Sequence, residues 1–392
     1  MAHKANYVIE KTAPGTRLNQ LMSWMDEHGD SLLGDPANGL EAIGIGKKNC
    51  SSINNNDDDW CITGFVKKKL SKKEMSLENV NMFSQTASAS AVDYAELSNI
   101  ELDVVETGSS FSSLPGLRIP VSQRGQFGGP PPAIDLQKRF DSVRSGIGIT
   151  NPVGSYPNSL SVGTLGFVVE DEDEIRYLVS NNHVIARENS AQIGNAVVQP
   201  GTLDLTQTEL QLMSNLNRLR SRLQIGNLSG WVDIKFGGVT NEVDVAIAEL
   251  NNSRNLDTVA RIGFGSTARG IASPYQIDDD GNVAESTSVY KAGRTTGWTE
   301  GHIAAIAVNS NVRYTKGIAN FKNQLAIVAT SDNGGTFSDA GDSGSAIWNE
   351  RNQLVGLLFA GSSAQTLANP IDLVMQEITA ELGNGQLTLV TE

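Results

Sequence analysis

The chain has 392 residues, of which 39% are hydrophobic and 19% are charged, and its formal net charge is −14. With its 39 glycines, the apolar share approaches that of globular proteins, which excludes a disordered chain and a coiled coil. The acidic surplus repels nucleic-acid phosphates and anionic lipid, and no apolar run reaches the roughly 18 residues that span a bilayer, so we expect neither partner.

Residues 1–135 predict a small α/β domain. Thr16 is a suitable N-cap for a helix, because a run of apolar residues with helical spacing follows it. The residues that share this helix face are Leu18, Leu21, Met22 and Met25. The strands expected here cover 41–48, 60–66 and 100–106. Residues 107–133 are rich in Gly, Ser and Pro, which indicates a linker, and we place the domain boundary near residue 135.

From residue 146 onward, short β-type runs are separated by Gly, Asn and Asp, which predicts an all-β sandwich or barrel. The expected strands are 163–169, 175–179, 196–199, 230–236, 243–250, 288–291, 302–308, 324–330, 345–348 and 354–359. A leucine stripe predicts a helix within 205–223. A last helix is expected over about 369–382, because Asn369, Pro370 and Asp372 suit its first turn.

Histidine is the usual general base near neutral pH, and the chain has four histidines. His3 lies near the end of the chain, His28 ends the expected N-terminal helix, and His302 lies inside an expected strand, so each has a structural explanation. His183 follows an apolar strand in the run Ser-Asn-Asn-His and is the remaining candidate. Considered alone, it is equally well explained as a structural histidine at a strand end.

Two further motifs carry candidate chemistry. Ser343 lies in Gly-Asp-Ser-Gly-Ser, where a sharp turn exposes the hydroxyl and directs backbone N–H groups into one concavity. The glycine spacing differs from the Gly-x-Ser-x-Gly of an α/β-hydrolase, and a plain β-turn is the simple alternative. Asp244 lies inside an apolar run, where a buried carboxylate needs a partner such as an imidazole N–H. The alternative is a solvent-facing carboxylate.

The chain order His183, Asp244, Ser343 on an all-β chain is the order of the chymotrypsin template. With the motifs around these residues, the chain resembles trypsin-like serine proteases of the chymotrypsin double β-barrel fold. It resembles in particular the intracellular trypsin-like proteases of bacteria and of the plant narrow-leaf type. The segments that carry this resemblance are 180–184, 199–201, 293–297, 341–345, 356–361 and 368–371.

The resemblance implies a mainly β fold with a two-barrel, chymotrypsin-like protease domain over 136–392, preceded by the small α/β domain. Barrel 1 is expected over about 146–255 and barrel 2 over about 256–368, followed by the C-terminal helix. The implied activity is that of a serine endopeptidase that cleaves protein or peptide substrates through an acyl-enzyme, with no metal or organic cofactor. A protease-like scaffold that binds peptides without turnover is the alternative.

The same resemblance implies roles for individual residues. Ser343 matches the nucleophile, His183 the general base, and Asp244 the carboxylate that orients the imidazole. The backbone N–H groups of Gly341 and Ser343 match the oxyanion hole. The positions that match the substrate-binding residues are Phe337, Phe359, Ala360 and Gly361. Because Phe337 stands where trypsin-like specificity needs an acid, cleavage after Lys or Arg is not implied.

The chain also departs from the secreted members of this family. Its only cysteines, Cys50 and Cys61, lie outside the protease segment, and residues 1–11 lack the apolar core of a signal peptide, which predicts a cytoplasmic protein. No good site generates a new Ile or Val N-terminus, and 144–148 is a poor match. Another contact must therefore order the oxyanion turn. The N-terminal domain is expected to regulate activity, and a homo-oligomer or a regulatory partner is left open.

Overall fold

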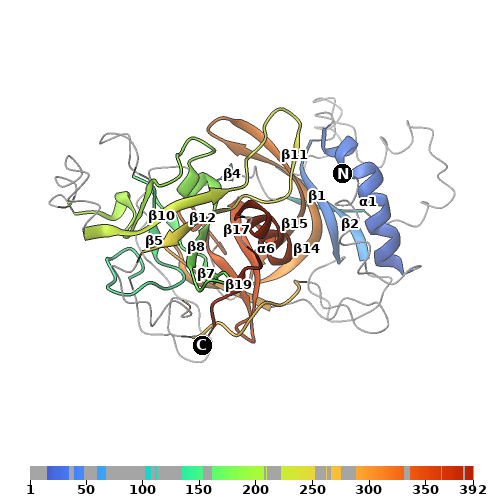
Figure 1. Ribbon diagram of the computed structural model, residues 1–392. Helices are drawn as coiled ribbons and strands as arrows, with labels where there is room; N and C mark the ends of the chain where they lie inside the picture. Colours follow the sequence, from blue (N-terminus) through green and yellow to red (C-terminus); the bar gives the residue numbers. More distant parts are fainter. Residues whose placement is uncertain are drawn as a thin grey trace.

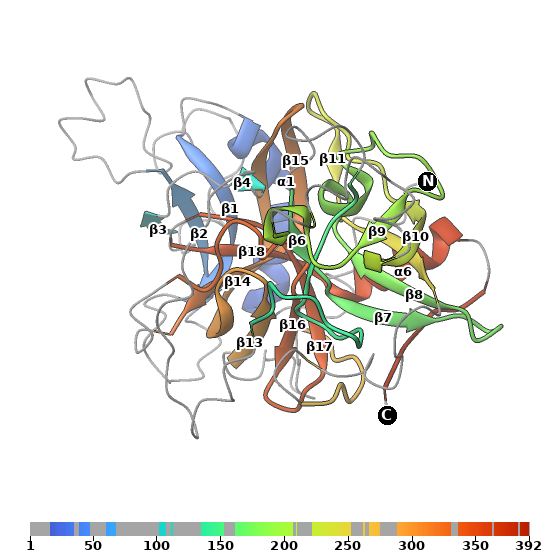
Figure 2. The ribbon, with the colours of Figure 1, turned by 90° about the vertical axis from the view of Figure 1, so that its left-hand side faces the viewer.

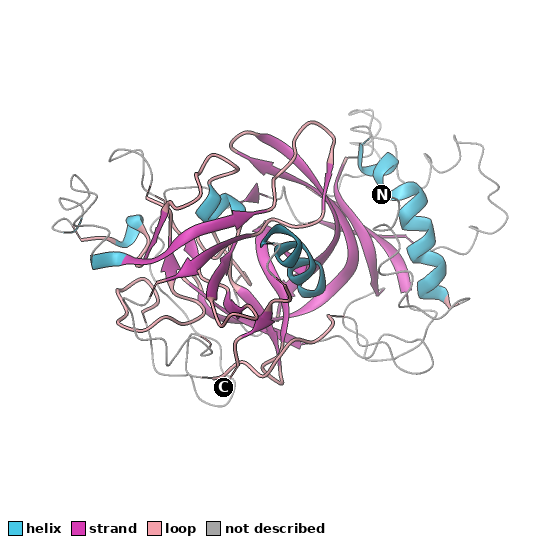
Figure 3. Cartoon of the chain, viewed as in Figure 1, coloured by secondary structure: helices cyan, strands magenta, loops and turns pink. Residues whose placement is uncertain are grey.

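The computed structural model describes a mainly β protein (Figure 3), as the sequence predicts. The residues that it describes are 16–34, 39–47, 60–67, 102–106, 111–112, 135–152, 161–206, 209, 222–251, 262, 266–274, 288–330, 336–362, 364–382 and 385–391. Most of the helix predicted within 205–223 and most of the 107–133 linker lie outside them. No helix in these ranges is long and apolar enough to cross a membrane.

The first barrel is built on a six-stranded sheet with the order β19-β7-β8-β12-β10-β9. Its strands are β7 (Phe167–Glu170), β8 (Arg176–Ser180), β9 (Ala196–Val198), β10 (Gln224–Trp231), β12 (Ala246–Leu250) and β19 (Thr388–Leu389). A two-stranded sheet of β5 (Gly148–Ile149) and β6 (Gly163–Thr164) lies beside it, and a bridge from Thr150 to Val198 joins β5 to β9. Because β8 ends where β12 begins, with Ser180 opposite Ala246, the residues that follow β8 meet those that precede β12.

The second barrel closes on itself, because the strands pair in the ring β13-β14-β15-β18-β17-β16-β13. Its strands are β13 (Ser288–Gly293), β14 (Gly297–Tyr314), β15 (Gly317–Ala329), β16 (Ala346–Asn349), β17 (Leu354–Gly361) and β18 (Thr366–Pro370). A short strand, β11 (Thr240–Asn241), pairs with the outer end of β15. In Figure 2, β13 and β14 lie to the left and β7 and β8 to the right, with β16 and β17 between them.

A shared core joins the two barrels. One cluster of buried apolar side chains takes Val179 and Ala248 from barrel 1, and Ala292, Ala346 and Leu357 from barrel 2. Helix α6 (Ile371–Leu382) follows β18 directly and contributes Ile371 and Val374 to the same cluster. The interface between the barrels is therefore packed as a continuous interior, which fixes residues from the two barrels relative to one another.

Several features of the barrels differ from the sequence-based prediction. The runs 302–308 and 324–330 are parts of one long hairpin, β14–β15, whose polar outer residues interrupt the apolar pattern. β18 was not expected, because Asn369 and Pro370 resemble a helix N-terminus; they end the strand, and α6 begins one residue later. The strand expected at 230–236 lies earlier, as β10, and ends at Trp231.

The N-terminal segment extends the sheet of barrel 2 (Figure 1). Helix α1 (Arg17–Gly34) lies beside β1 (Leu40–Lys47) and β2 (Trp60–Val66), and β3 (Leu102–Glu106) is paired in parallel with β2. Strand β1 is antiparallel to β14, with Ile45 opposite Ile306. The expected cap is present, since Thr16 Oγ1 accepts a hydrogen bond from the amide of Asn19 at 3.3 Å. The N-terminal segment contains a helix and strands, as predicted. However, its strands continue the sheet of barrel 2 instead of forming a separate sheet.

The apolar face of α1 shares a core with barrel 2. Leu21 is fully buried, and its cluster also contains Ile43 of β1 and Ile327 of β15. We therefore expect Leu21→Ala to lower the free energy of unfolding by about 2–5 kcal/mol and to shift the transition of the whole chain. Gln20→Ala, on the exposed face of the same helix, is the control. Calorimetry that shows an unchanged barrel transition in the Leu21→Ala variant would indicate that the N-terminal segment unfolds independently.

Candidate active site

His183 and Asp244 meet at the junction of β8 and β12. His183 lies in a helical turn, η4 (Asn182–Ala186), that starts two residues after β8, and Asp244 lies two residues before β12. The Nδ1 atom of His183 is 2.6 Å from Oδ2 of Asp244, and the backbone amide of His183 donates to Oδ1 at 3.2 Å. Two hydrogen bonds to one carboxylate fix both the ring and the backbone of the histidine. A neutral imidazole held in this way donates from Nδ1 and leaves Nε2 as the proton acceptor.

The carboxylate of Asp244 is fully buried, so its charge needs further partners. The hydroxyl of Tyr314, at the end of β14, donates to Oδ2 at 2.8 Å. Burial, and then the negative charge of Asp244, raise the pKa of Tyr314 well above its usual value, so this hydroxyl keeps its proton and remains a donor. Three hydrogen bonds therefore reach the carboxylate, one of them from barrel 2.

The backbone around Asp244 is held by asparagine side chains. Its amide donates to Oδ1 of Asn369 at 3.1 Å, and its carbonyl accepts from Nδ2 of Asn181 at 2.7 Å. The Asn369 side chain donates in turn to Oε1 of Gln324 at 2.6 Å. Asp244 is thus tied to β8 through Asn181, and to β15 and β18 of barrel 2 through Asn369 and Gln324.

Ser343 lies in a tight turn of barrel 2 that packs against barrel 1. Its carbonyl accepts from the amide of Thr164, in β6, at 2.8 Å. The next residue, Gly344, has φ of 92°, and a Cβ at this position would lie 2.3 Å from Oγ of Ser180. Only glycine fits both this left-handed backbone and this close approach, so the turn lies against the strand that leads to His183.

Gly163 marks how near the serine turn is to the histidine turn. A Cβ on Gly163 would lie 2.5 Å from a methyl carbon of Val184, the neighbour of His183, and 3.0 Å from the carbonyl oxygen of Ser343. The structure thus brings the three predicted catalytic residues to one place between the barrels. No hydrogen bond joins Oγ of Ser343 to His183, and the buried Nε2 of His183 has no acceptor or donor among the residues described. Such a contact often tightens only when substrate binds.

The predicted oxyanion hole is the same turn. Neither the amide of Gly341 nor that of Ser343 donates to another group in the described part of the chain, whereas the amide of Asp342 between them donates to the carbonyl of Asp339 at 3.0 Å. The amide of Gly344 is also used, since it donates to the carbonyl of Leu358 at 2.8 Å. The two amides named by the sequence analysis are therefore those that are available to a developing negative charge.

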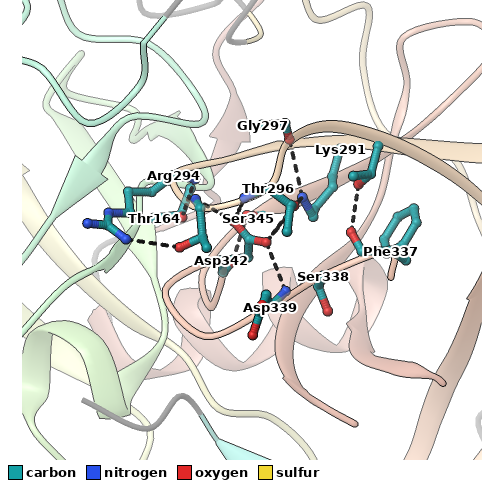
Figure 4. Close-up of polar contacts among 12 residues, drawn as sticks. Thr164, Lys291, Arg294, Thr296, Gly297, Phe337, Ser338, Asp339, Asp342 and Ser345 are labelled. Atoms are coloured by element: carbon teal, nitrogen blue, oxygen red, sulfur yellow. Dashed lines mark hydrogen bonds and ion pairs between the residues drawn. The ribbon is translucent and has the colours of Figure 1, made fainter. Parts of the chain in front are cut away.

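A buried ion pair holds this turn (Figure 4). The carboxylate of Asp342 and the ammonium of Lys291, in β13, are both fully buried, with Nζ 3.4 Å from Oδ2. Asp342 also accepts from the amide of Thr295 at 2.8 Å and from the hydroxyl of Thr296 at 2.6 Å. The amide of Asp339 adds a fourth contact, at 3.0 Å to Oδ2. The acid next to the nucleophile is therefore satisfied by groups of its own barrel.

Lys291 thus provides a buried cation for the acid next to Ser343. Its ammonium also donates to Thr296 Oγ1 at 2.5 Å and to the carbonyl of Gly297 at 3.2 Å, so its N–H groups have hydrogen-bond partners. Burial lowers the pKa of Lys291, and the negative charge of Asp342 opposes that change. Neither Lys291 nor Tyr314 was predicted. A lysine that ends an apolar strand directly before the Gly293–Gly297 motif was a usable signal, whereas nothing local marks Tyr314.

The predicted substrate-binding residues lie near the turn, and most of their side chains are buried. Phe337 packs in the core that barrel 2 shares with α1, and its ring centroid lies 5.8 Å from Nζ of Lys291. Phe359 is fully buried against Phe321, so only its backbone can face a ligand. Ala360 and Gly361 end β17 just beyond the contact between Leu358 and the serine turn.

Within the described residues, no three His, Cys, Asp or Glu side chains gather as they would around a metal ion. His302 lies in β14, as expected of a structural residue, and burial lowers its pKa. His28 lies next to Trp24 inside α1, which continues to Gly34 instead of ending at His28 as predicted. Of the three histidines that the structure describes, His183, the candidate predicted from the sequence, is the one paired with a buried carboxylate.

Residues 163–357 match the family model of the trypsin-like peptidase domain. The matched segment starts at β6 and ends in β17, so it includes His183, Asp244 and Ser343. The chain therefore carries a trypsin-like peptidase domain, and it is a serine endopeptidase. This confirms the trypsin-like protease family that the sequence motifs indicated, and it favours an enzyme over a scaffold without turnover.

Solved structures with a similar chain course include Thermobifida fusca protease A, Nocardiopsis protease and Cellulomonas bogoriensis chymotrypsin. The first is 17% identical, covers 64% of this chain and 100% of its own, and has a TM-score of 0.40. The second is 16% identical, covers 63% of this chain and 98% of its own, and has a TM-score of 0.39. The third is 17% identical, covers 64% of this chain and 100% of its own, and has a TM-score of 0.37. Likeness at this level supports no conclusion about the reaction. Among curated proteins, none matches the chain.

Proposed function

We propose that this serine protease hydrolyses peptide bonds through an acyl-enzyme formed on Ser343, with His183 as general base and Asp244 as its orienting carboxylate. The observation that carries the proposal is the 2.6 Å contact between His183 and a fully buried Asp244, directly beside the serine turn. A structural histidine has no need of a carboxylate that also accepts from the Tyr314 hydroxyl and whose backbone is held by Asn181 and Asn369. This arrangement instead suits an imidazole that must carry a positive charge for part of the reaction cycle.

The proposed reaction proceeds in balanced proton steps. Nε2 of His183 takes the proton of the Ser343 hydroxyl as Oγ bonds to the scissile carbonyl carbon, and the amides of Gly341 and Ser343 bind the resulting oxyanion. His183 then gives the proton to the leaving amine as the C–N bond breaks. Water, deprotonated by the same Nε2, attacks the ester, and the proton returns to Oγ when the acyl group leaves.

Substrate is proposed to bind as an extended strand along the backbone of Phe359, Ala360 and Gly361. Leu358 supports this position, because it is bonded to the serine turn through Gly344 and Ser345. Phe337 stands at the position that matches the base of the specificity pocket and carries no carboxylate, so a preference for Lys or Arg is not part of the proposal. A peptide-library cleavage profile of the wild type beside Ser343→Ala tests the activity, and identical profiles would contradict it.

Activity is expected to be independent of a metal ion, because the proposed oxyanion hole is made of backbone amides and the base is a histidine. Dialysis against a chelator should leave kcat/KM within about twofold of its starting value. The control is the same treatment followed by back-addition of Zn²⁺, Mg²⁺ or Ca²⁺. A large loss that one of these ions restores would show that the proposed chemistry is incomplete.

Regulation by the N-terminal segment remains part of the proposal, and it is supported by the core that α1 and β1 share with barrel 2. The domain boundary near residue 135, a homo-oligomer or regulatory partner, and a cytoplasmic location all stay predictions from the sequence.

A further inference from the structure

Strand β17 has two sides, and one of them leads past the nucleophile. On the first side β18 pairs with it from Gly356 to Gly361. On the second side β16 pairs with it as far as Leu357, and the serine turn then takes over, because Leu358 exchanges hydrogen bonds with Gly344 and Ser345 at 2.8 and 2.9 Å. Any strand that continues this second side beyond Leu358 must lie next to Ser343.

The chain itself supplies such a strand. Strand β4 (Phe111–Ser112) is antiparallel to the end of β17, with Ser112 opposite Ala360 and Phe111 opposite Gly361. Its direction from Phe111 to Ser112 therefore runs toward Leu358 and the serine turn. These two β17 residues belong to the edge that the sequence analysis assigned to substrate.

The other neighbour of β4 belongs to the support of the triad. Phe111 pairs in parallel with Arg313 of β14, and the next residue, Tyr314, donates its hydroxyl to Asp244. β4 thus lies between β17, which is hydrogen-bonded to the serine turn, and β14, whose last residue donates to the Asp244 carboxylate. A peptide substrate added to β17 would need the same space.

We propose that the segment containing Phe111 and Ser112 is a built-in competitor, which occupies the substrate-binding edge in cis and must leave before a peptide can bind. The inference rests on the proposed function, because it takes the end of β17 to be the substrate edge. The pairing described for this segment spans two residues, and a substrate that makes a longer set of backbone hydrogen bonds can displace it. The segment therefore raises the apparent KM without changing the chemistry at Ser343.

The direct test is the double variant Phe111→Pro/Ser112→Pro, because proline has no amide proton and disfavours strand pairing. Toward a short peptide substrate, KM should fall about tenfold with kcat unchanged, as for the loss of one or two backbone hydrogen bonds. The matched control is Phe111→Ala/Ser112→Ala, which keeps both amides and should stay close to the wild type. An unchanged KM in the proline variant, or a lower kcat at constant KM, would overturn the proposal.

A second measurement needs no variant. Hydrogen exchange of the wild type should show that the amides of the 111–112 segment lose protection when a peptide aldehyde binds covalently to Ser343. Protection that stays unchanged on binding would contradict displacement. A synthetic peptide with the sequence of residues 107–116 should also inhibit the proline variant competitively, while a scrambled peptide should not.

The failure of this inference can be told apart from the failure of the proposed function. A small fluorophosphonate needs the nucleophile and not the strand edge, so it should label Ser343 in both the wild type and the proline variant. If Ser343 is labelled in both proteins and their KM values for the peptide substrate are equal, the proposal of a built-in competitor is wrong while the proposed function stands. If neither is labelled while both are folded, the proposed function falls and the inference falls with it.

Discussion

Replacing Asp244 by Asn is expected to lower kcat about 10⁴-fold while the fold is kept. The asparagine amide fits the same space, but it no longer provides the charge that stabilises the His183 imidazolium, and the histidine is held in the wrong tautomer. The buried contacts from Tyr314 and the His183 amide make this position sensitive, because no water can substitute for the lost oxygen. Steady-state kinetics with a short peptide, beside circular dichroism, measures the effect.

The controls use the other members of the triad. Ser343→Ala and His183→Ala should each remove most activity, and the double variant should lose little more, because the three groups act as one unit. Asp233→Asn, on a carboxylate that binds the Trp231 indole at the exposed surface, should be neutral. If turnover is nearly unchanged in Asp244→Asn, this carboxylate is not the partner of a catalytic histidine.

Lys291→Met should cause the second large loss of stability and activity. It leaves the carboxylate of Asp342 buried without its cation, which costs about 3–5 kcal/mol of stability for a broken buried pair. Because Asp342 lies between the two proposed oxyanion amides, a shifted carboxylate displaces them, and we expect kcat to fall about 10²–10³-fold. Lys138→Met, at an exposed ion pair, is the matched control.

Lys291 is a positioning residue, so its variant needs a readout beyond stability. At a temperature where Lys291→Met is folded, KM should change little while kcat falls, because the substrate edge of β17 is intact. Burial lowers the pKa of Lys291, so wild-type activity should decline on the alkaline side before an exposed lysine would titrate. Lys291→Arg, which keeps its charge, should move this decline to higher pH. A variant in which only KM changes, with kcat as in the wild type, would contradict the role of Lys291 in positioning the oxyanion amides.

The sequence predicts the parts of this fold that local chemistry determines. Apolar runs bounded by Gly, Asn and Asp mark most strands of both barrels. The side chains of a barrel strand either alternate between apolar and polar or are buried throughout, and each strand ends in a turn. The serine turn is also local, since Gly344 is required by its own backbone angle and by one close contact. His183 and Asp244 could be paired only through the chain order of a known template, because 61 residues separate them.

What the sequence could not predict depends on contacts between distant segments. No local pattern shows that β1 pairs with β14, or that Tyr314 reaches Asp244 across 70 residues. Lys291 is buried although lysine is usually exposed. Its burial is explained by its ion pair with Asp342, which lies in the serine turn, far away in the sequence. The pairing of β4 with β17 falls within a stretch whose Gly, Ser and Pro content indicates a linker.

The central claim is that Ser343 is activated by the His183–Asp244 pair, and covalent labelling by a fluorophosphonate tests it most directly. Mass spectrometry of the digested protein should find the label on Ser343 in the wild type. Labelling should be slower by orders of magnitude in His183→Ala and Asp244→Asn, and denaturation of the wild type before labelling should abolish it. A folded wild-type protein that leaves Ser343 unlabelled, or that labels equally fast without His183, would contradict the account.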